Sequence, residues 1–553
     1  MKLRPYGRSL AAALVLGLVA EILFDGPALG IGVVVFVATL LLGALLVRPA
    51  GAAFDRADLW LAPGAVVFAG FIALRADPTL ILFDLVAALS LAAGAAVALS
   101  GTPVMRTAVD GVVRLAGWTV AVVLVGTAHL VEQTRPWTGV PAVSAATTRK
   151  GETIARGLLL AAIPVTAFVA LFAAADAVFA RALSDVTSVS IDLGELPSRA
   201  TFALVGAWLA GGFLAIVVFG TDPKGARGRG LATWSGVFFG TPAPTGPSTV
   251  PTSARAAASV AEPAPATVAP GQAPIVGWRL PDAPAPAAAR LRLTLGWAEA
   301  TIVLVAIELV FAVFVVIQVA YLFGGRDTLA ASGQTYSEYA TRGFQELVVV
   351  AILAGAVILS LEALVERRPR IYVAASAGLL AMTAVVLASA FLRLRLYQDA
   401  YGWTELRFYV FSAIAYLGLA IVIVGALLVS DRSRWSIHGL AIAALGIAVA
   451  VNLVGPHAFV AGQNVARAID PSLVPAGGKS GLDADYVLSL SDDAVPTLVA
   501  ALPLIPEADR SRIEDGLRRR SADLASDPAL RSPSAWNLAR AQAREALDRL
   551  PPR

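Results

Sequence analysis

The residues best suited to do chemistry in this chain are polar side chains inside or beside long apolar stretches. Glu308 stands near the middle of the apolar stretch Ala300–Phe323, and Gln318 follows ten residues later, on roughly the same side of a helix. Ionisable residues inside a membrane span are costly and often functional, so this pair could bind a proton or another ion. The alternative is a structural carboxyl group, neutral or paired, that joins helices through hydrogen bonds. We favour the structural alternative for Glu308.

A second set of candidates lies in two segments that border apolar stretches, Tyr336–Leu347 and Arg393–Arg407. Both segments mix aromatic and charged residues, and Glu338, Arg342 and Glu346 have the helical i,i+4 spacing that allows ion pairs. Such a cluster could bind a polar ligand or a lipid headgroup. Alternatively, it locks helix ends together and docks the C-terminal tail, and we favour this interpretation. The candidates are Tyr336, Glu338, Tyr339, Arg342, Glu346, Tyr397, Asp399, Tyr401, Glu405 and Arg407.

Several kinds of site are excluded or disfavoured by the residues present. The chain has no Cys, which excludes disulfides, thiolate catalysis and Cys-based metal sites. The three histidines, His129, His438 and His457, show no metal-ligand spacing, so we predict no metal site, no cofactor and no catalytic constellation. Gly478–Ser480 is similar to the end of a phosphate-binding loop, but the first glycine of that pattern is replaced by Leu473. We therefore interpret this segment as a flexible loop.

Twelve apolar stretches must position these residues. The chain is 57% hydrophobic with a mean hydropathy of +0.74. Charged residues make up only 15%, whereas soluble domains carry about 25%. A helix of about 20 apolar residues spans a bilayer, and it satisfies its own backbone hydrogen bonds there. We therefore predict an all-α, polytopic membrane bundle of about 11–12 transmembrane helices, followed by a small, soluble, helical tail. The predicted spans are Ser9–Phe24, Leu29–Val47, Leu59–Leu74, Leu80–Leu99, Val112–Val131, Ile154–Ala175, Thr201–Phe219, Ala300–Phe323, Leu347–Val365, Ile371–Leu392, Phe408–Val429 and Ile437–Val454.

Composition divides the chain into four parts. Residues 1–219 form an N-terminal block of spans, and residues 298–454 form a C-terminal block. Residues 220–297 are rich in Pro and Ala and hold too little apolar surface to bury a core, so we predict a disordered cytoplasmic linker. Residues 455–553 form the soluble tail, in which amphipathic spacing predicts helices over Asp493–Leu502, Glu507–Leu524 and Ser534–Leu550.

Basic residues near the span ends predict the orientation in the plasma membrane, because cytoplasmic loops are enriched in Lys and Arg. They follow the seventh span, precede the eighth, and separate the ninth from the tenth and the eleventh from the twelfth. These loops should be cytoplasmic, and everything after Val454 extracytoplasmic. The weakest span, Val112–Val131, decides on which side of the membrane the N-terminus lies. The N-terminus is inside if this stretch does not cross the membrane, and outside if it does. Orientation also explains the net charge of +4 better than nucleic-acid binding does.

Several motifs border the later spans or lie in the tail: Tyr321–Gly325, Tyr336–Tyr339, Arg342–Phe344, Leu394–Arg407, Leu482–Tyr486 and Leu490–Pro496. These motifs resemble an uncharacterised bacterial family of membrane proteins, domain of unknown function 4153, and its near-relative 4173. The resemblance covers roughly residues 154–502. It implies an integral bacterial membrane protein with no established activity, and it supplies no catalytic residues. In the tail it marks a candidate motif that consists of Asp483, Asp485, Tyr486 and Asp493.

Three functions are compatible with this sequence. The favoured one is a non-enzymatic plasma-membrane protein that binds or senses something, or holds a partner, at the extracytoplasmic face. The alternative is a secondary transporter that uses the intramembrane carboxylate Glu308. The third is an envelope enzyme acting on a lipid-linked substrate, although the first outer loop, Asp25–Ala28, is too short to hold the acidic site of such enzymes. The expected partners are the lipid bilayer and a membrane or envelope protein, with no nucleic acid.

Overall fold

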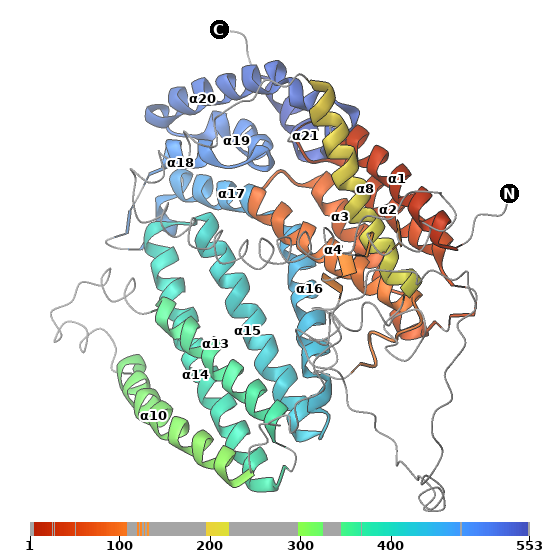
Figure 1. The fold of residues 1–553 in the computed structure, drawn as a ribbon. Helices are drawn as coiled ribbons and strands as arrows, with labels where there is room; N and C mark the ends of the chain where they lie inside the picture. The colour runs from red at the N-terminus through yellow and green to blue at the C-terminus, as the bar shows by residue number, and fades with distance from the viewer. Residues whose placement is uncertain are drawn as a thin grey trace, which may run out of the picture.

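The structure, a computed structural model of the chain, consists of α-helices and short 3-10 helices (Figure 1). The described part contains no β-strand, which agrees with the all-α prediction. It comprises residues 5–24, 26, 28–49, 51–52, 54–107, 119–120, 122–123, 126–127, 130–131, 195–219, 297–323, 344–365, 368–475, 478–479 and 481–550.

The N-terminal block is built from helices whose small residues allow close packing. Helix α1 lies along α8, where the backbone of Gly17 approaches Ala203 and Ala207 so closely that a side chain at Gly17 would clash with both. Such contacts between small residues are typical of helices that pack in membranes. The helices of this block are α1 (Pro5–Leu23), α2 (Ile31–Val47), α3 (Leu61–Leu74), α4 (Pro78–Leu99) and α8 (Glu195–Phe219).

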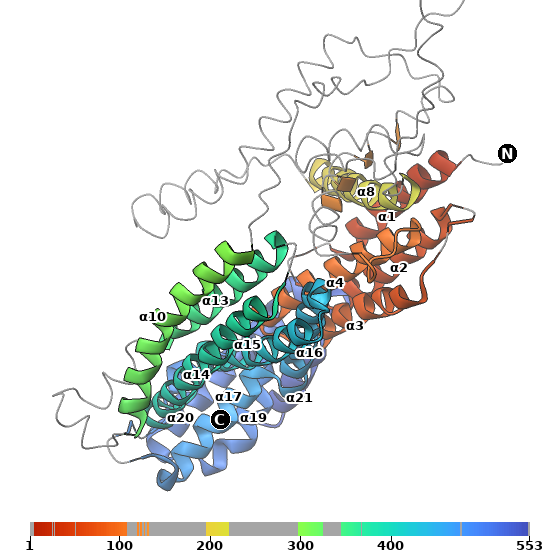
Figure 2. The same cartoon turned by 90° about the horizontal axis from the view of Figure 1, so that it is seen from below.

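The C-terminal block surrounds α14, which packs against α10, α13 and α15. Helix α14 ends at Gly402, whose φ of +80° suits glycine, and α15 begins after Thr404, whose hydroxyl caps it by accepting a hydrogen bond from the Arg407 backbone N–H. The helices of this block are α10 (Trp297–Phe323), α13 (Phe344–Leu364), α14 (Arg370–Tyr401), α15 (Glu405–Val429) and α16 (Ser436–Val454). In Figure 2 the two blocks lie side by side, and they meet where α16 contacts α4.

Five helical segments are long and apolar enough to cross a membrane: Arg56–Leu74, Pro78–Leu99, Arg370–Tyr401, Glu405–Val429 and Ser433–Val454. Four shorter apolar helices accompany them in the described part of the chain. Large apolar side chains point outward from these helices, among them Leu42, which is 55% exposed, and Val422, which is 65% exposed. An apolar exterior suits a lipid environment and not water. The described part therefore has the architecture of a multi-pass membrane protein.

The predicted spans agree closely with the helices that the structure describes, with one correction. The predicted spans Ile371–Leu392 and Phe408–Val429 leave Arg393–Arg407 as the connection between them, but α14 continues to Tyr401 and α15 starts at Glu405, so only three residues connect the two helices. The polar residues of this stretch concealed its helical continuation because the apolar run ends near Leu392. The predicted span Ile154–Ala175 and nearly all of the predicted linker lie outside the described residues.

The tail covers one end of both blocks, at the top of Figure 1. We call this the tail end. The turn before α2 reaches it, because the Ile31 backbone N–H donates to the Trp536 carbonyl over 2.9 Å. The α3–α4 turn also reaches it, because Asn537 donates to the carbonyls of Ile72 and Arg75 at 2.9 and 2.6 Å.

We call the opposite end the arginine end. There the carboxylate of Asp58 accepts hydrogen bonds from the Val104 and Met105 backbone N–H groups. The ring of His438, at the start of α16, lies 3.2 Å from the Val104 carbonyl, so the two blocks also share this end. The connections at this end carry Arg48, Arg56, Arg106, Arg368, Arg370, Arg432 and Arg434.

Helix directions place the start of α1 at the arginine end. Helix α8 runs antiparallel to α1, because Arg199 pairs with Glu21 at 2.5 Å while Gly211 lies beside Ala13. The described residues of the predicted span Val112–Val131 are helical and contact α8, where the Thr127 hydroxyl donates to the Trp208 carbonyl.

The tail is a small helical body built around an apolar core. Val460, Val487, Leu498, Ile513 and Leu517 are buried together, and the same cluster includes Leu80, Phe408 and Val451 from the ends of α4, α15 and α16. The tail and the bundle therefore share one core. The predicted tail helices correspond to α19, α20 and α21, whereas α17 and α18 were not predicted. The tail helices are α17 (Pro456–Ile469), α18 (Ala484–Ser489), α19 (Val495–Ala501), α20 (Glu507–Ser526) and α21 (Leu538–Leu547).

Candidate functional site

Three titratable side chains from distant parts of the chain meet at the tail end. Asp77 comes from the α3–α4 turn, Glu405 from the first turn of α15, and His457 from the first turn of α17. Nε2 of His457 lies 3.2 Å from Oε2 of Glu405 and 3.5 Å from Oδ2 of Asp77. We call these three residues the junction cluster, because they belong to the N-terminal block, the C-terminal block and the tail.

Local structure holds each of these residues in place. Asp77 caps α4: its Oδ1 accepts hydrogen bonds from the backbone N–H groups of Thr79, at 2.9 Å, and Leu80, at 3.2 Å. Glu405 follows the capping residue of α15. His457 follows Gly455 and Pro456, where a left-handed glycine ends α16 and a proline begins α17. Helix starts therefore position all three side chains.

Neighbouring hydroxyl groups bind the two carboxylates. Tyr409 donates to Oδ2 of Asp77 over 2.8 Å, and the Thr79 hydroxyl donates to Oε1 of Glu405 over 2.7 Å. The hydroxyl of Tyr486 accepts a hydrogen bond from the Glu405 backbone N–H at 2.7 Å. These contacts fix the orientation of both carboxylates and connect them to the tail.

The other ring nitrogen of His457 faces Ser491. The Ser491 backbone N–H donates to Nδ1 over 2.9 Å, and the Ser491 hydroxyl lies 2.8 Å from the same nitrogen. That hydroxyl also donates to Oδ2 of Asp493 over 3.0 Å. Nε2 is buried and makes no hydrogen bond with the described residues. The ring is therefore held from behind, with Nε2 directed at the carboxylates.

Burial dominates the electrostatics of the cluster. The side chains of Asp77 and His457 are only 1% and 4% exposed, whereas that of Glu405 is 34% exposed. Burial raises the pKa of Asp77 above its ordinary value, while the nearby charge of His457 and the hydrogen bond from Tyr409 act in the opposite direction. Two carboxylates at a buried site require a positive partner. The cluster is thus suited to hold a proton or a cation.

A chain of polar contacts leads from the cluster into the bundle. The Asp493 carboxylate accepts from the Ala76 backbone N–H at 2.7 Å and pairs with Arg75 at 3.6 Å. Arg75 also donates to the Asn452 carbonyl. The Asn452 side chain, in turn, donates to Oδ1 of Asp84 over 2.7 Å. Asp84 is fully buried within α4, and its Oδ2 has no hydrogen-bond partner among the described residues.

The residues predicted to form an outer polar cluster divide into separate groups. The guanidinium of Arg407 stacks 4.1 Å from the ring centre of Tyr397, whose ring lies 5.0 Å from that of Tyr401. Asp399 pairs with Arg395 instead, at 3.2 Å. These contacts tighten the α14–α15 turn, and only Glu405 joins the junction cluster. Four of the candidates lie outside the described residues: Tyr336, Glu338, Tyr339 and Arg342. For Glu346, at the start of α13, only the backbone is described.

The predicted tail motif has mixed roles. Tyr486 and Asp493 contact the junction, as described above. Asp483 caps α18 by accepting from the Tyr486 backbone N–H over 3.1 Å. Asp485 forms an exposed ion pair with Arg512 at 2.6 Å, and such pairs contribute little to stability.

The intramembrane candidate Glu308 contacts the neighbouring helix. Its carboxylate lies against Gly378 of α14, where an added Cβ would clash with it. Gln318 lies in α10, and its side chain is outside the described set.

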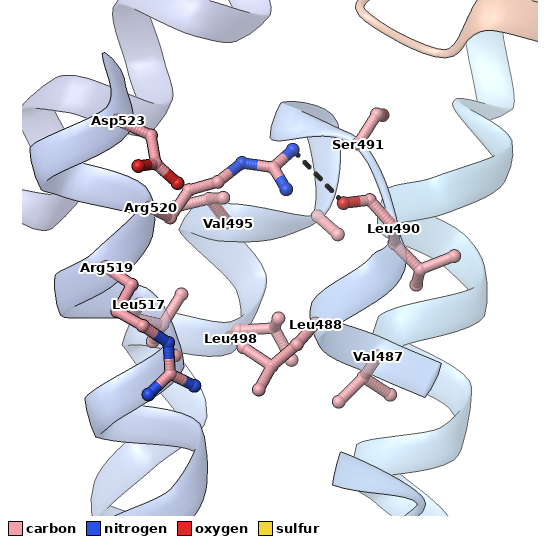
Figure 3. Close-up of a pocket in the computed structure, with 12 residues that line it drawn as sticks. Val487, Leu488, Leu490, Ser491, Val495, Leu498, Leu517, Arg519, Arg520 and Asp523 are labelled. Atoms are coloured by element: carbon pink, nitrogen blue, oxygen red, sulfur yellow. Dashed lines mark hydrogen bonds between the residues drawn. The ribbon is translucent and has the colours of Figure 1, made fainter. Parts of the chain in front are cut away.

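The tail also contains a cavity of about 240 Å³ between α18, α19 and α20 (Figure 3). Its wall is mostly apolar, with Val487, Leu498 and Leu517 facing the space, while Arg519 and Arg520 approach it from α20. The dashed line in Figure 3 marks the 3.2 Å hydrogen bond from Arg520 to the Leu490 carbonyl. Ser491 borders this cavity as well, so the space lies directly behind the junction cluster.

Sequence reasoning missed Asp77, Asp84 and His457. Asp84 was detectable, because it is an acidic residue inside the predicted span Leu80–Leu99. Asp77, followed by Pro78 and an apolar run, has the signature of a helix cap but no sign of a second role. His457 lies far from its partners in sequence, and only the folded tail brings them together.

Comparison with known proteins gives one match. No curated protein and no solved structure matches this chain. The sequence model of one family, described as Domain of unknown function (DUF4153), matches residues 61–233 and 265–501. These ranges include the whole junction cluster, as well as Asp84, Ser491 and Asp493. The match covers most of the chain, in agreement with the resemblance of the sequence motifs, and the chain therefore belongs to the DUF4153 family of unknown function.

Proposed function

We propose that this protein is a multi-pass, non-enzymatic protein of the bacterial plasma membrane that binds and senses a ligand at its extracytoplasmic face. One observation carries the proposal: Asp77, Glu405 and His457 bring the two helix blocks and the tail together at a single buried polar site. A ligand bound there contacts all three parts at once. Binding therefore favours the docked arrangement over any arrangement in which the tail separates from the bundle.

The distribution of basic residues supports the outward position of the tail. The connections at the arginine end carry the Arg residues named above, and α1 also starts at that end, next to Lys2 and Arg4 in the sequence. Short cytoplasmic loops are enriched in Lys and Arg. The arginine end is thus the cytoplasmic end, which directs the tail to the outside.

Thiol labelling tests this orientation cleanly, because the chain has no native Cys. Ala508→Cys places a thiol at an exposed position of α20, and Ser430→Cys places one at an exposed position of the arginine end. A membrane-impermeant maleimide should label Ala508→Cys in intact spheroplasts, and Ser430→Cys only after permeabilisation. Labelling of Ser430→Cys alone in intact spheroplasts would overturn the proposed function.

A secondary transporter is the second candidate, and one observation favours it. Asp84 is buried in an apolar helix, has one carboxylate oxygen without a hydrogen bond, and is connected to the tail end through Asn452 and Arg75. In this second proposal we therefore assign the ion-carrying role to Asp84 instead of Glu308. Proton flux into proteoliposomes that stops in Asp84→Asn but persists in Glu308→Gln would establish this function. Equal background leakage of protons with the wild type, Asp84→Asn and Glu308→Gln would exclude the transporter function.

A further inference from the structure

The atoms of the junction cluster are spaced like ligands around one small cation. Nε2 of His457 lies 3.2 Å from Oε2 of Glu405 and 3.5 Å from Oδ2 of Asp77. In a tetrahedral zinc site, ligand atoms about 2.0–2.1 Å from the metal are about 3.3 Å from one another. The ligand atoms of all three residues lie within 4.8 Å of one another. One ion can therefore reach all of them.

The orientation of the His457 ring supports a bound ion independently of these distances. Its side chain is 4% exposed, and Nε2 is buried without a hydrogen bond even though two carboxylate oxygens lie nearby. Those oxygens are close enough to share a ligand with Nε2, but not aligned to accept a hydrogen bond from it. A buried polar atom without a partner is costly. The orientation of the ring thus points to a ligand between the nitrogen and the carboxylates.

We propose that Asp77, Glu405 and His457 bind one divalent cation of the zinc type. This inference rests on the proposed function, since it names the ligand of the same site. Imidazole nitrogen is a common ligand of zinc and other late transition metals, whereas calcium and magnesium sites use oxygen ligands. Three protein ligands leave a fourth position for water or a further group.

The groups around the cluster orient the ligands as metal sites require. Oδ1 of Asp77 is held by two backbone N–H groups of α4, and Tyr409 donates to Oδ2. Oε1 of Glu405 is held by the Thr79 hydroxyl, which leaves Oε2 directed at His457. Hydrogen bonds to ligand carboxylates are a regular feature of protein metal sites.

Ser491 connects metal binding to the tail. When the cation occupies Nε2, the ring proton resides on Nδ1 and is donated to the Ser491 hydroxyl, which donates to Asp493. The Ser491 backbone N–H, which otherwise donates to Nδ1, must then turn away. Metal binding thus replaces the hydrogen bond from the Ser491 backbone N–H to Nδ1 with one from Nδ1–H to the Ser491 hydroxyl. This exchange takes place next to Asp493, which pairs with Arg75.

Access to the site and its charge also fit a cation. Glu405 is the most exposed of the three ligands, at 34%, so an ion can enter along its side chain. The ion balances two carboxylates that burial would otherwise disfavour. Because the ligands come from both helix blocks and the tail, the bound cation fastens these three parts together.

Zinc binding to the full-length protein in detergent tests the proposal. The purified protein is stripped with a chelator, titrated with Zn²⁺, and compared with samples given Mg²⁺ or Ca²⁺. We expect one Zn²⁺ per chain by elemental analysis. Ser491→Ala, which removes the hydroxyl behind the ring and its hydrogen bond to Asp493, should weaken binding about 10- to 100-fold. Glu405→Gln and His457→Gln, which remove a ligand atom itself, should weaken binding by more than Ser491→Ala.

His438→Gln is the matched control, because His438 lies at the arginine end and contacts Val104 instead of the cluster. It should bind zinc like the wild type. Glu405→Gln preserves side-chain size and the backbone contact with Tyr486, and size-exclusion chromatography with circular dichroism verifies its fold. Zinc binding no tighter than magnesium binding would overturn the metal site. A loss of zinc affinity in His438→Gln as large as the loss in the cluster variants would overturn it as well. A cytoplasmic tail with intact zinc binding would instead overturn the proposed function alone.

Discussion

Thr79 serves both carboxylates of the junction cluster. Its backbone N–H donates to Asp77 at 2.9 Å, and its hydroxyl donates to Glu405 at 2.7 Å. One residue at the start of α4 therefore sets the relative position of two acidic side chains from different blocks. Its hydroxyl can be removed with little change in shape, because valine has the same branched shape as threonine.

Thr79→Val should destabilise the protein, whereas Thr79→Ser should not. Valine keeps the branched shape but leaves Oε1 of Glu405 without its donor, which should lower the free energy of unfolding by about 0.5–1.5 kcal/mol, since Glu405 is partly exposed. Serine keeps the hydroxyl. Thermal unfolding of the purified variants in detergent measures the difference. Equal melting temperatures for the two variants would show that the Thr79–Glu405 contact contributes no stability.

Gly402 forms the tight connection between α14 and α15. Its φ is +80°, and a Cβ there would lie 2.8 Å from Oδ1 of Asn464, which accepts from the Trp403 backbone N–H. Gly402→Ala should therefore lower the free energy of unfolding by about 1–3 kcal/mol. Gly70→Ala is the control, because its Cβ meets nothing within 4 Å. A melting temperature for Gly402→Ala as high as that of Gly70→Ala would contradict this account of the turn.

At the scale of elements, apolar length predicted most of the bundle. Runs such as Leu80–Leu99 identified their helices within a few residues, because a span must be long, apolar and helical. Polar helical turns had no comparable signal. The last turns of α14 were assigned to a loop, and α17 was not predicted, although its 14 residues form an amphipathic helix. Both errors fall at the tail end, where the junction cluster forms, so the site was only partly predictable.

The contact between α1 and α8 depends on glycine. A Cβ at Gly17 would lie 2.4 Å from the Ala203 carbonyl oxygen. Gly17→Leu should therefore separate the two helices and reduce the yield of folded, monodisperse protein. Gly355→Leu in α13, where nothing lies within 4 Å, should be tolerated. Fluorescence-detected size-exclusion chromatography of both variants measures this difference, and a normal Gly17→Leu profile would contradict the close packing.

At the scale of the whole molecule, the tail unites two helix blocks that lie side by side (Figure 2). Its core includes Leu80 from α4 and Phe408 from α15, and its polar groups complete the junction cluster. The sequence predicted a membrane bundle and a helical tail as separate parts. It could not predict that the parts converge, because the contacts join residues more than 300 positions apart, as in the hydrogen bond from Tyr409 to Asp77.

The most direct test of the central claim is a disulfide between the tail and the N-terminal block. A Cβ built at Gly32 of α2 lies 3.1 Å from Cβ of Ser534, within a few tenths of an ångström of the range of about 3.5–4.5 Å seen in disulfides. Gly32→Cys combined with Ser534→Cys therefore places two thiols in bonding reach. Such a bond forms spontaneously only in an oxidising compartment outside the cytoplasm.

A protease site inserted between Pro242 and Pro286 allows the bond to be read on a non-reducing gel. We predict that the two fragments stay joined after cleavage when both cysteines are present, without added oxidant, and that they separate with reductant or with Gly32→Cys alone. Fragments that separate in the double variant without reductant would contradict a tail docked at the outer face.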